Sequence, residues 1–142
     1  MKVLLLLFGV LLTSHVMASE IIFIVNSKNP ITELTQNEIA EIFLKKQRHW
    51  KDGSAIRFFD RESESKERIE FLNKYLKRTS RDIDQYWIGQ KLNTGNSAPA
   101  QLASESLALA LVARFSGAIS YISSDRYKGV KGVKKIEIKT SP

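Results

Sequence analysis

The chain has 142 residues, no cysteine and a formal net charge of +7, with 22 Lys and Arg against 15 Asp and Glu. The lack of cysteine excludes disulfide-stapled domains and cysteine-ligated zinc sites. The basic surplus favours anionic partners weakly, and it bears on solubility as much as on function.

Residues 1–18, MKVLLLLFGVLLTSHVMA, have the layout of a secretory signal peptide. Lys2 forms a short basic region, residues 3–12 are apolar, and residues 16–18 resemble a cleavage site. The apolar run is about half of the roughly 20 residues that a membrane-spanning helix needs, so a permanent anchor is the less favoured alternative. We therefore expect a signal peptide over 1–18, one domain over 19–142, and a periplasmic protein.

Residues 20–27 form a continuous apolar stretch that predicts a buried strand covered on both faces. A loop with Pro30 follows, and then LTQNEIAEIFLK predicts a helix. Thr35 is its N-cap, and Glu38, three residues on, completes a capping box. After a basic loop, residues 55–61 predict the second strand.

Residues 65–77 predict an amphipathic helix with an inward stripe of Ile69, Leu72 and Leu76. Thr79 is placed to cap a further helix.

The stretch 93–102 is expected to be a loop, and 104–115 a strongly apolar helix that ends near Gly117. Residues 118–123 predict a third strand. Residues 133–139 predict a last, Lys-rich strand, which suits an exposed sheet edge. Strands that alternate with helices indicate an α/β layered domain with a mainly parallel sheet.

The sequence contains no phosphate-binding loop, no dinucleotide motif and no defensible catalytic triad. After residue 18 the single histidine is His49. The acidic residues Asp60, Glu62, Glu64 and Glu67 lie among Arg and Lys, which predicts a solvated ion-pair cluster. We therefore expect no enzyme activity, no metal and no cofactor.

Two basic stretches remain. The loop KKQRHWK combines cations with Trp50, but nucleic-acid binding is not expected of an exported protein, and Trp50 is expected to pack. The lysines of the C-terminal tail are expected to be solvated. Together the two stretches could face an anionic partner such as lipid headgroups.

Two segments resemble phosphate-type periplasmic substrate-binding proteins of ABC transporters. NSKNPITELTQNEIAEIFLKKQRHWKDG resembles a segment in which an Asn-rich loop and a helix lead to Ile-Phe, Gly-Lys and Trp. Gly117 and the stretch AISYIS resemble the closing strand of the family, with Ser120 replacing a usual Gly. The matching residues of the first segment are Asn26, Asn29, Pro30, Leu34, Thr35, Ile42, Phe43, Lys46 and Trp50, and Lys45 stands at a usual Gly.

The resemblance implies a three-layer lobe of the type II periplasmic-binding-protein fold, with a mainly parallel sheet and helices on both faces. Members of the family normally clamp a ligand between two lobes, and this chain resembles a single lobe. The resemblance implies a small oxyanion such as phosphate as ligand, and a transporter or another envelope protein as partner. It implies neither a nucleic-acid partner nor a membrane anchor after signal cleavage.

The turn DRESESKER resembles the phosphate-binding turn R-x-x-x-S-G-T of the family. Arg61 and Ser65 match, Lys66 and Glu67 stand at the Gly and Thr positions, and Arg68 matches the helix that follows. Free backbone N–H groups at a helix start, a hydroxyl and a guanidinium all suit an anion. The candidate ligand-binding residues are therefore Arg61, Ser65, Lys66, Glu67 and Arg68.

Three interpretations of this turn stay open. It is a simple helix cap on the surface, a weak anion site, or a tight phosphate site. The carboxylate of Glu67 would repel a bound phosphate, which disfavours the last. A domain that has kept the fold and lost its ligand, and that acts as a protein–protein interaction module in the cell envelope, is the alternative function.

Overall fold

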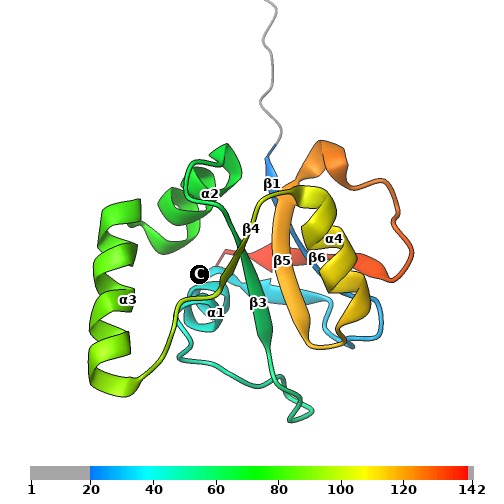
Figure 1. Ribbon diagram of the computed structural model, residues 1–142. Helices are drawn as coiled ribbons and strands as arrows, with labels where there is room; N and C mark the ends of the chain where they lie inside the picture. The colour runs from blue at the N-terminus through cyan, green and yellow to red at the C-terminus, as the bar shows by residue number, and fades with distance from the viewer. Residues whose placement is uncertain (1–19, 141–142) are drawn as a thin grey trace, which may run out of the picture.

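Six strands form one sheet that lies between helices on both faces (Figure 1). The computed structural model describes residues 20–140. The signal peptide predicted for residues 1–18 lies outside this range. The three layers and the helices on both faces agree with the predicted fold class.

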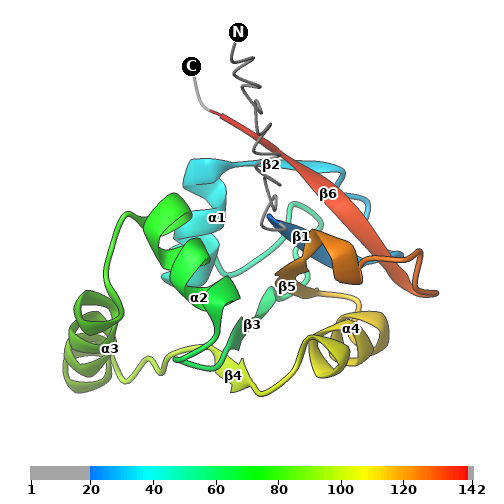
Figure 2. The same cartoon turned by 90° about the horizontal axis from the view of Figure 1, so that it is seen from above.

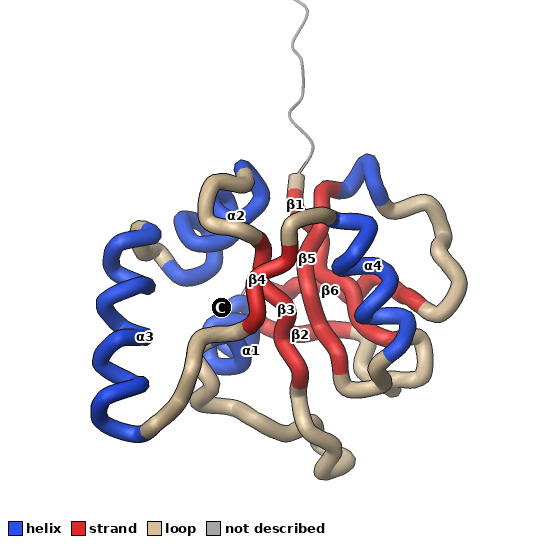
Figure 3. The backbone as a smooth tube through the Cα atoms, viewed as in Figure 1, coloured by secondary structure: helices blue, strands red, loops and turns tan. Residues whose placement is uncertain are grey.

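The strand order is β2-β6-β1-β5-β3-β4, and Figure 3 shows the strands side by side across the molecule. The pairs β2–β6, β3–β5 and β3–β4 are parallel. The central strand β1 runs antiparallel to both of its neighbours, β5 and β6. The bounds are β1 Ile21–Asn26, β2 Glu33–Thr35, β3 Arg57–Arg61, β4 Ala100–Leu102, β5 Ala118–Ser123 and β6 Val133–Lys139.

Helices α1 and α2 cover one face of the sheet, with α3 packed at the side of this helix layer, and α4 covers the other face (Figure 2). Helix α2 continues directly into a π-helical turn. The bounds are α1 Gln36–Phe43, α2 Lys66–Phe71, the π-helical turn Leu72–Leu76, α3 Ser80–Thr94, α4 Glu105–Arg114 and a short 3₁₀ turn Ser124–Arg126.

The core under α1 and α2 is largely aromatic. The rings of Phe71 and Tyr121 stack with centroids 4.5 Å apart, and Phe23 meets Tyr75 edge-on at 4.8 Å. The core under α4 is aliphatic, with Ala108 and Val112 of the helix packed on the sheet. Both faces of the central strands are therefore buried, as the apolar sequence of residues 20–27 predicted.

The predicted capping box at Thr35 is present in the structure, and the predicted cap at Thr79 proves to be a second capping box. The Thr35 hydroxyl accepts from the backbone N–H of Glu38 at 3.1 Å, and Glu38 Oε2 accepts from the Thr35 N–H at 2.7 Å. Thr79 and Asp82 make the same pair of bonds at the start of α3. These reciprocal bonds satisfy two otherwise free donors at each helix start. They also lower the pKa of the Asp82 carboxyl.

Two short strands, β2 and β4, lie in segments that were predicted to be loops. Each has three residues, which is too short for a visible alternation of polar and apolar side chains. Strand β2 pairs with the outer side of β6. The prediction that the Lys-rich last strand lies at the sheet edge is therefore wrong.

The predicted inward stripe of the helix after β3 is also wrong in part. Ile69 is 47% exposed, whereas Glu67 and Arg68 are buried together with Phe71. Glu67 and Arg68 form ion pairs in the interior. The π-helical turn that follows changes which residues of the helix face the sheet. An apolar pattern cannot predict buried charges of this kind.

Gly117 does not end α4 in a left-handed conformation. A Cβ at this position would lie 2.1 Å from the carbonyl oxygen of Ala55. The Gly117 carbonyl accepts from the indole of Trp50 at 3.1 Å and from the N–H of Arg57 at 3.0 Å. Close backbone approach therefore requires glycine here. Trp50 is buried, which confirms its predicted packing role.

Candidate anion-binding turn

The turn between β3 and α2 holds most of the predicted site residues. Ser65 is the N-cap of α2: its hydroxyl accepts from the N–H of Arg68 at 3.3 Å and donates to the carbonyl of Glu62 at 2.9 Å. Lys66, the first helical residue, is exposed. The hydroxyl that was expected to meet an anion therefore bonds to the backbone of its own turn.

Arg61, at the end of β3, is buried between two carboxylates. Its Nε donates to the carbonyl of Leu102 at 3.3 Å. Its Nη1 lies 3.9 Å from Glu67 Oε2 and 3.7 Å from Glu105 Oε1, and it has no hydrogen-bond partner among residues 20–140. These are loose ion pairs that leave a buried donor unsatisfied.

Glu105, the first residue of α4, links α4 to the end of β5. Its Oε1 accepts from the backbone N–H of Ser123 at 2.6 Å and from the Ser123 hydroxyl. That hydroxyl also lies 3.3 Å from Glu67 Oε1. Glu105 Oε2 pairs with Arg126 Nε at 3.2 Å. We call Arg61, Glu67, Glu105, Ser123 and Arg126 the Arg61 cluster.

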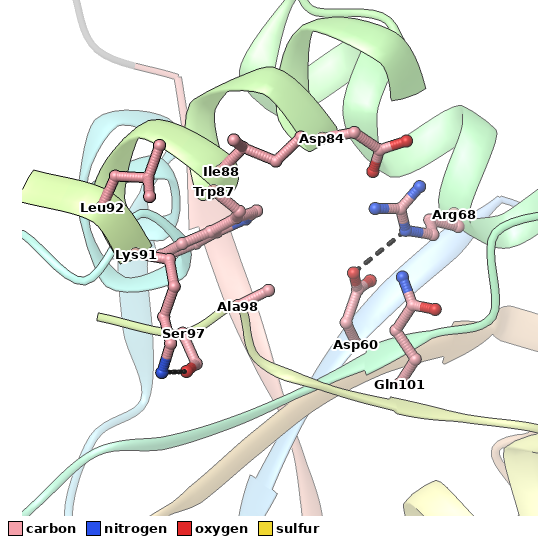
Figure 4. Close-up of a pocket in the computed structure, with 10 residues that line it drawn as sticks. All are labelled: Asp60, Arg68, Asp84, Trp87, Ile88, Lys91, Leu92, Ser97, Ala98 and Gln101. Carbon is pink, nitrogen blue, oxygen red and sulfur yellow. Dashed lines mark hydrogen bonds and ion pairs between the residues drawn. The ribbon is translucent and has the colours of Figure 1, made fainter. Parts of the chain in front are cut away.

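The side chain of Arg68 belongs to a separate buried group. Its Nε lies 3.0 Å from Asp60 Oδ2 (Figure 4). Its Nη1 donates to Ser80 Oγ at 3.4 Å. Asp60 Oδ1 accepts from the hydroxyl of Tyr121 at 2.5 Å and from the N–H of Arg61 at 2.8 Å. Burial, and then the charge of Asp60, raise the pKa of Tyr121.

The structure thus divides the five predicted residues. Arg61 and Glu67 come together, Ser65 caps the helix beside them, Lys66 faces solvent, and Arg68 points elsewhere. Sequence reasoning missed Glu105, Ser123 and Tyr121, because only the fold brings these distant residues to the turn.

The prediction that the acidic residues of the turn form a solvated cluster is wrong for half of them. Asp60 and Glu67 are buried in ion pairs, whereas Glu62 and Glu64 are exposed. Two arginines and two glutamates balance the charge of the Arg61 cluster. An oxyanion could reach the guanidinium of Arg61 only if the carboxylates of Glu67 and Glu105 moved away from it.

Residues 20–140 contain no group of three His, Asp or Glu side chains arranged to hold a metal ion. Within the same range, no helix has both the length and the apolar character that membrane crossing requires.

Three solved structures are similar to the chain. An ABC-type phosphate transport receptor from Vibrio cholerae matches with a TM-score of 0.63 and 22% identity, over 87% of this chain and 48% of the receptor. PstS from Borrelia burgdorferi matches with a TM-score of 0.68 and 19% identity, over 87% of this chain and 49% of PstS. A phosphate ABC transporter substrate-binding protein from Clostridium perfringens, solved with bound phosphate, matches with a TM-score of 0.55 and 25% identity. The match covers 84% of this chain and 45% of that protein.

This chain therefore spans about half the length of the solved structures that it matches. No curated protein matches it. A family model for the PBP superfamily domain matches residues 8–140. These findings confirm the predicted fold class and the resemblance to phosphate-type substrate-binding proteins.

Proposed function

The chain belongs to the family of the PBP superfamily domain, and from this premise we propose that it is an exported accessory of an ABC transport system that binds a small oxyanion such as phosphate weakly. The site is the turn after β3, where the guanidinium of Arg61 is the group that would bind the anion and the exposed Lys66 adds positive charge. Ser65 caps the helix, and the side chain of Arg68 is paired with Asp60. Glu67 lies in the same turn and opposes binding.

One observation carries this proposal: Nη1 of Arg61 is a buried donor without a hydrogen-bond partner among the described residues. An unsatisfied buried donor costs roughly 1–3 kcal/mol, so an incoming oxygen acceptor would gain a bond that the free protein lacks. Arginine also binds oxyanions with two parallel N–H groups. The two flanking carboxylates limit the affinity, because an anion must displace them from the guanidinium.

The similar proteins support the same ligand class. A phosphate transport receptor and a structure with bound phosphate share the fold of this chain. The proposal requires neither catalysis nor a cofactor.

Isothermal titration calorimetry of residues 19–142 tests the proposal. Phosphate and sulfate are expected to bind with millimolar dissociation constants, and chloride at equal ionic strength serves as the control. A titration without heat beyond dilution at millimolar phosphate and sulfate would refute oxyanion binding.

The second candidate is an interaction module of the cell envelope that has kept the fold and lost its ligand. The observation in its favour is that Glu67 and Glu105 already stand at the guanidinium of Arg61, where an anion would bind. Light scattering separates the two candidates when calorimetry shows no heat. A stable dimer would support the module, whereas a monomer without anion binding would support neither candidate.

Export is a further part of the proposal. Cleavage after Ala18 would release a periplasmic protein that begins at Ser19. Expression of the full sequence in a bacterial host, followed by mass spectrometry of the periplasmic fraction, checks this. A chain recovered from the membrane fraction with residues 1–18 attached would contradict it.

A further inference from the structure

A pocket of about 520 Å³ opens between helix α3 and the edge strand β4 (Figure 4). Of the five candidate anion-binding residues only Arg68 lines it, and the Arg61 guanidinium that the proposed oxyanion site depends on does not. A volume of this order lies within the range of pockets that hold small organic molecules.

The pocket contains an unused hydrogen-bond donor. Trp87 is only 7% exposed, and its indole Nε1 has no partner among residues 20–140. The indole lines the pocket (Figure 4). By contrast, the buried indole of Trp50 donates to the carbonyl of Gly117. Buried indole N–H groups usually donate to an acceptor, so a ligand in this pocket is expected to place an oxygen atom near Trp87 Nε1.

Four charged residues line the pocket: Asp60 and Arg68, which pair with each other, Asp84, and Lys91, which donates to the Ser97 hydroxyl. The guanidinium of Arg68 has five N–H donors, and its bonds to Asp60 and Ser80 use two of them. In Figure 4 the guanidinium points into the pocket, with the carboxylate of Asp84 nearby. Asp84 is exposed and has no ion-pair partner in the described part of the chain. The pocket thus offers donors for an oxygen atom and a carboxylate for an ammonium group.

The rim of the pocket is apolar. Ile88 and Leu92 project from α3 one turn apart and are 61% and 80% exposed. Ala98 faces them from the segment before β4 (Figure 4). These side chains could bury a branched aliphatic group of a ligand, which would remove apolar surface from water.

We propose that this pocket binds an apolar α-amino acid, either free or as the first residue of a peptide. Its ammonium group pairs with Asp84, and its carboxylate or carbonyl oxygen accepts from Trp87 Nε1 and Arg68. Its side chain packs on Ile88 and Leu92. Both sources of the ligand present the same ammonium, oxygen and apolar group. This inference does not rest on oxyanion binding at the turn.

The chain has two tryptophans, so the variant Trp50→Phe leaves Trp87 as its single indole. ¹⁵N-labelled Trp50→Phe protein, after a check by circular dichroism that it is folded, is titrated with L-leucine and with Leu-Gly-Gly. The Trp87 indole N–H signal is expected to shift downfield and to saturate with at least one of them. The tighter ligand identifies the source, and the absence of a saturable shift with both overturns the proposal.

The ammonium contact has its own test. N-acetyl-L-leucine lacks the ammonium group, and Asp84→Asn removes its partner. Each change is expected to weaken binding severalfold, because Asp84 is exposed and water screens its contact with the ammonium group. Asp125→Asn removes an exposed carboxylate elsewhere and is expected to leave binding unchanged. Equal affinities of Asp84→Asn and the unmodified protein for the tighter ligand would overturn the proposal.

Discussion

Tyr121 on β5 donates its hydroxyl proton to Asp60 Oδ1 on β3, across a distance of 2.5 Å, and both residues are buried. The bond joins two neighbouring strands at the point where β3 leads into the candidate turn. It adds to the bonds that Asp60 accepts from Arg68 and from the N–H of Arg61.

Replacement of Tyr121 by Phe would leave the packing of the ring and remove this bond. We expect Tyr121→Phe to lower the free energy of unfolding by about 1–3 kcal/mol, because a buried carboxylate loses a donor. Urea denaturation measures the change. Tyr127→Phe, which alters a hydroxyl near the surface, should change stability by less than about 0.5 kcal/mol. Equal losses in both variants would contradict the assigned role of the Tyr121 bond.

Alkaline pH offers an independent check of the same residue. The pKa of Tyr121 in the folded protein is raised above the unfolded value of about 10. Above that pH the unfolded chain releases the Tyr121 proton while the folded protein keeps it. Stability should therefore fall as pH rises, by at most about 1.4 kcal/mol per pH unit from this group. Urea denaturation between about pH 9 and pH 11, one unit either side of the unfolded pKa, measures this decline in the free energy of unfolding. The decline should be shallower in Tyr121→Phe than in the unmodified protein, and parallel declines would contradict this.

Arg68→Met would remove the charge that compensates Asp60. Because the partner carboxylate would stay buried, we expect a loss of about 3–5 kcal/mol in the free energy of unfolding. Lys66→Met, on the same helix, removes an exposed charge and should change stability by less than about 0.5 kcal/mol. Thermal and urea denaturation of both variants check the difference, and an Arg68→Met protein of unchanged stability would show that the pair contributes nothing.

Glu67→Gln would remove one of the two carboxylates beside Arg61 and keep the shape of the side chain. We expect phosphate to bind this variant at least about tenfold more tightly by calorimetry, because the guanidinium loses an internal counter-charge. Glu64→Gln makes the same change of net charge at an exposed position and should have a much smaller effect. Unchanged affinity in Glu67→Gln would place any anion site elsewhere.

Gly117→Ala should destabilise the protein by about 1–3 kcal/mol, because the new Cβ would collide with the backbone of Ala55. Gly89→Ala provides the matched control: it lies inside α3, nothing stands within 4 Å of the added Cβ, and alanine favours helices by about 1 kcal/mol. In urea denaturation we expect the free energy of unfolding to fall in Gly117→Ala and to rise in Gly89→Ala. A loss in both variants would contradict it.

Local signals in the sequence predicted much of the fold. The capping boxes at Thr35 and Thr79, and the apolar runs of β1 and β5, depend on neighbouring residues alone. The short strands β2 and β4 could not be predicted this way, because three residues carry no periodic pattern and form strands only through pairing with β6 and β3.

The site was less accessible to sequence reasoning. Arg61 and Ser65 were identified through their resemblance to a known turn, and the structure places Ser65 as a helix cap. One ion-pair partner of Arg61, Glu67, lies in the same turn, but the other, Glu105, comes from α4, more than forty positions along the chain. Buried ion pairs of this kind contradict the usual expectation that charged side chains face solvent, so an amphipathic pattern assigns them to the wrong side of a helix.

The arrangement of strand lengths has a consequence for solubility. The edge strands β2 and β4 have three residues each, and the longer strands β1, β3, β5 and β6 lie inside the sheet. At the β2 edge, Glu33 pairs with Lys139 at 2.7 Å, which adds charge to that border. Short and charged edges offer few free backbone groups to another chain. The fold therefore protects itself against edge-to-edge aggregation without a disulfide, which the cysteine-free sequence could not supply.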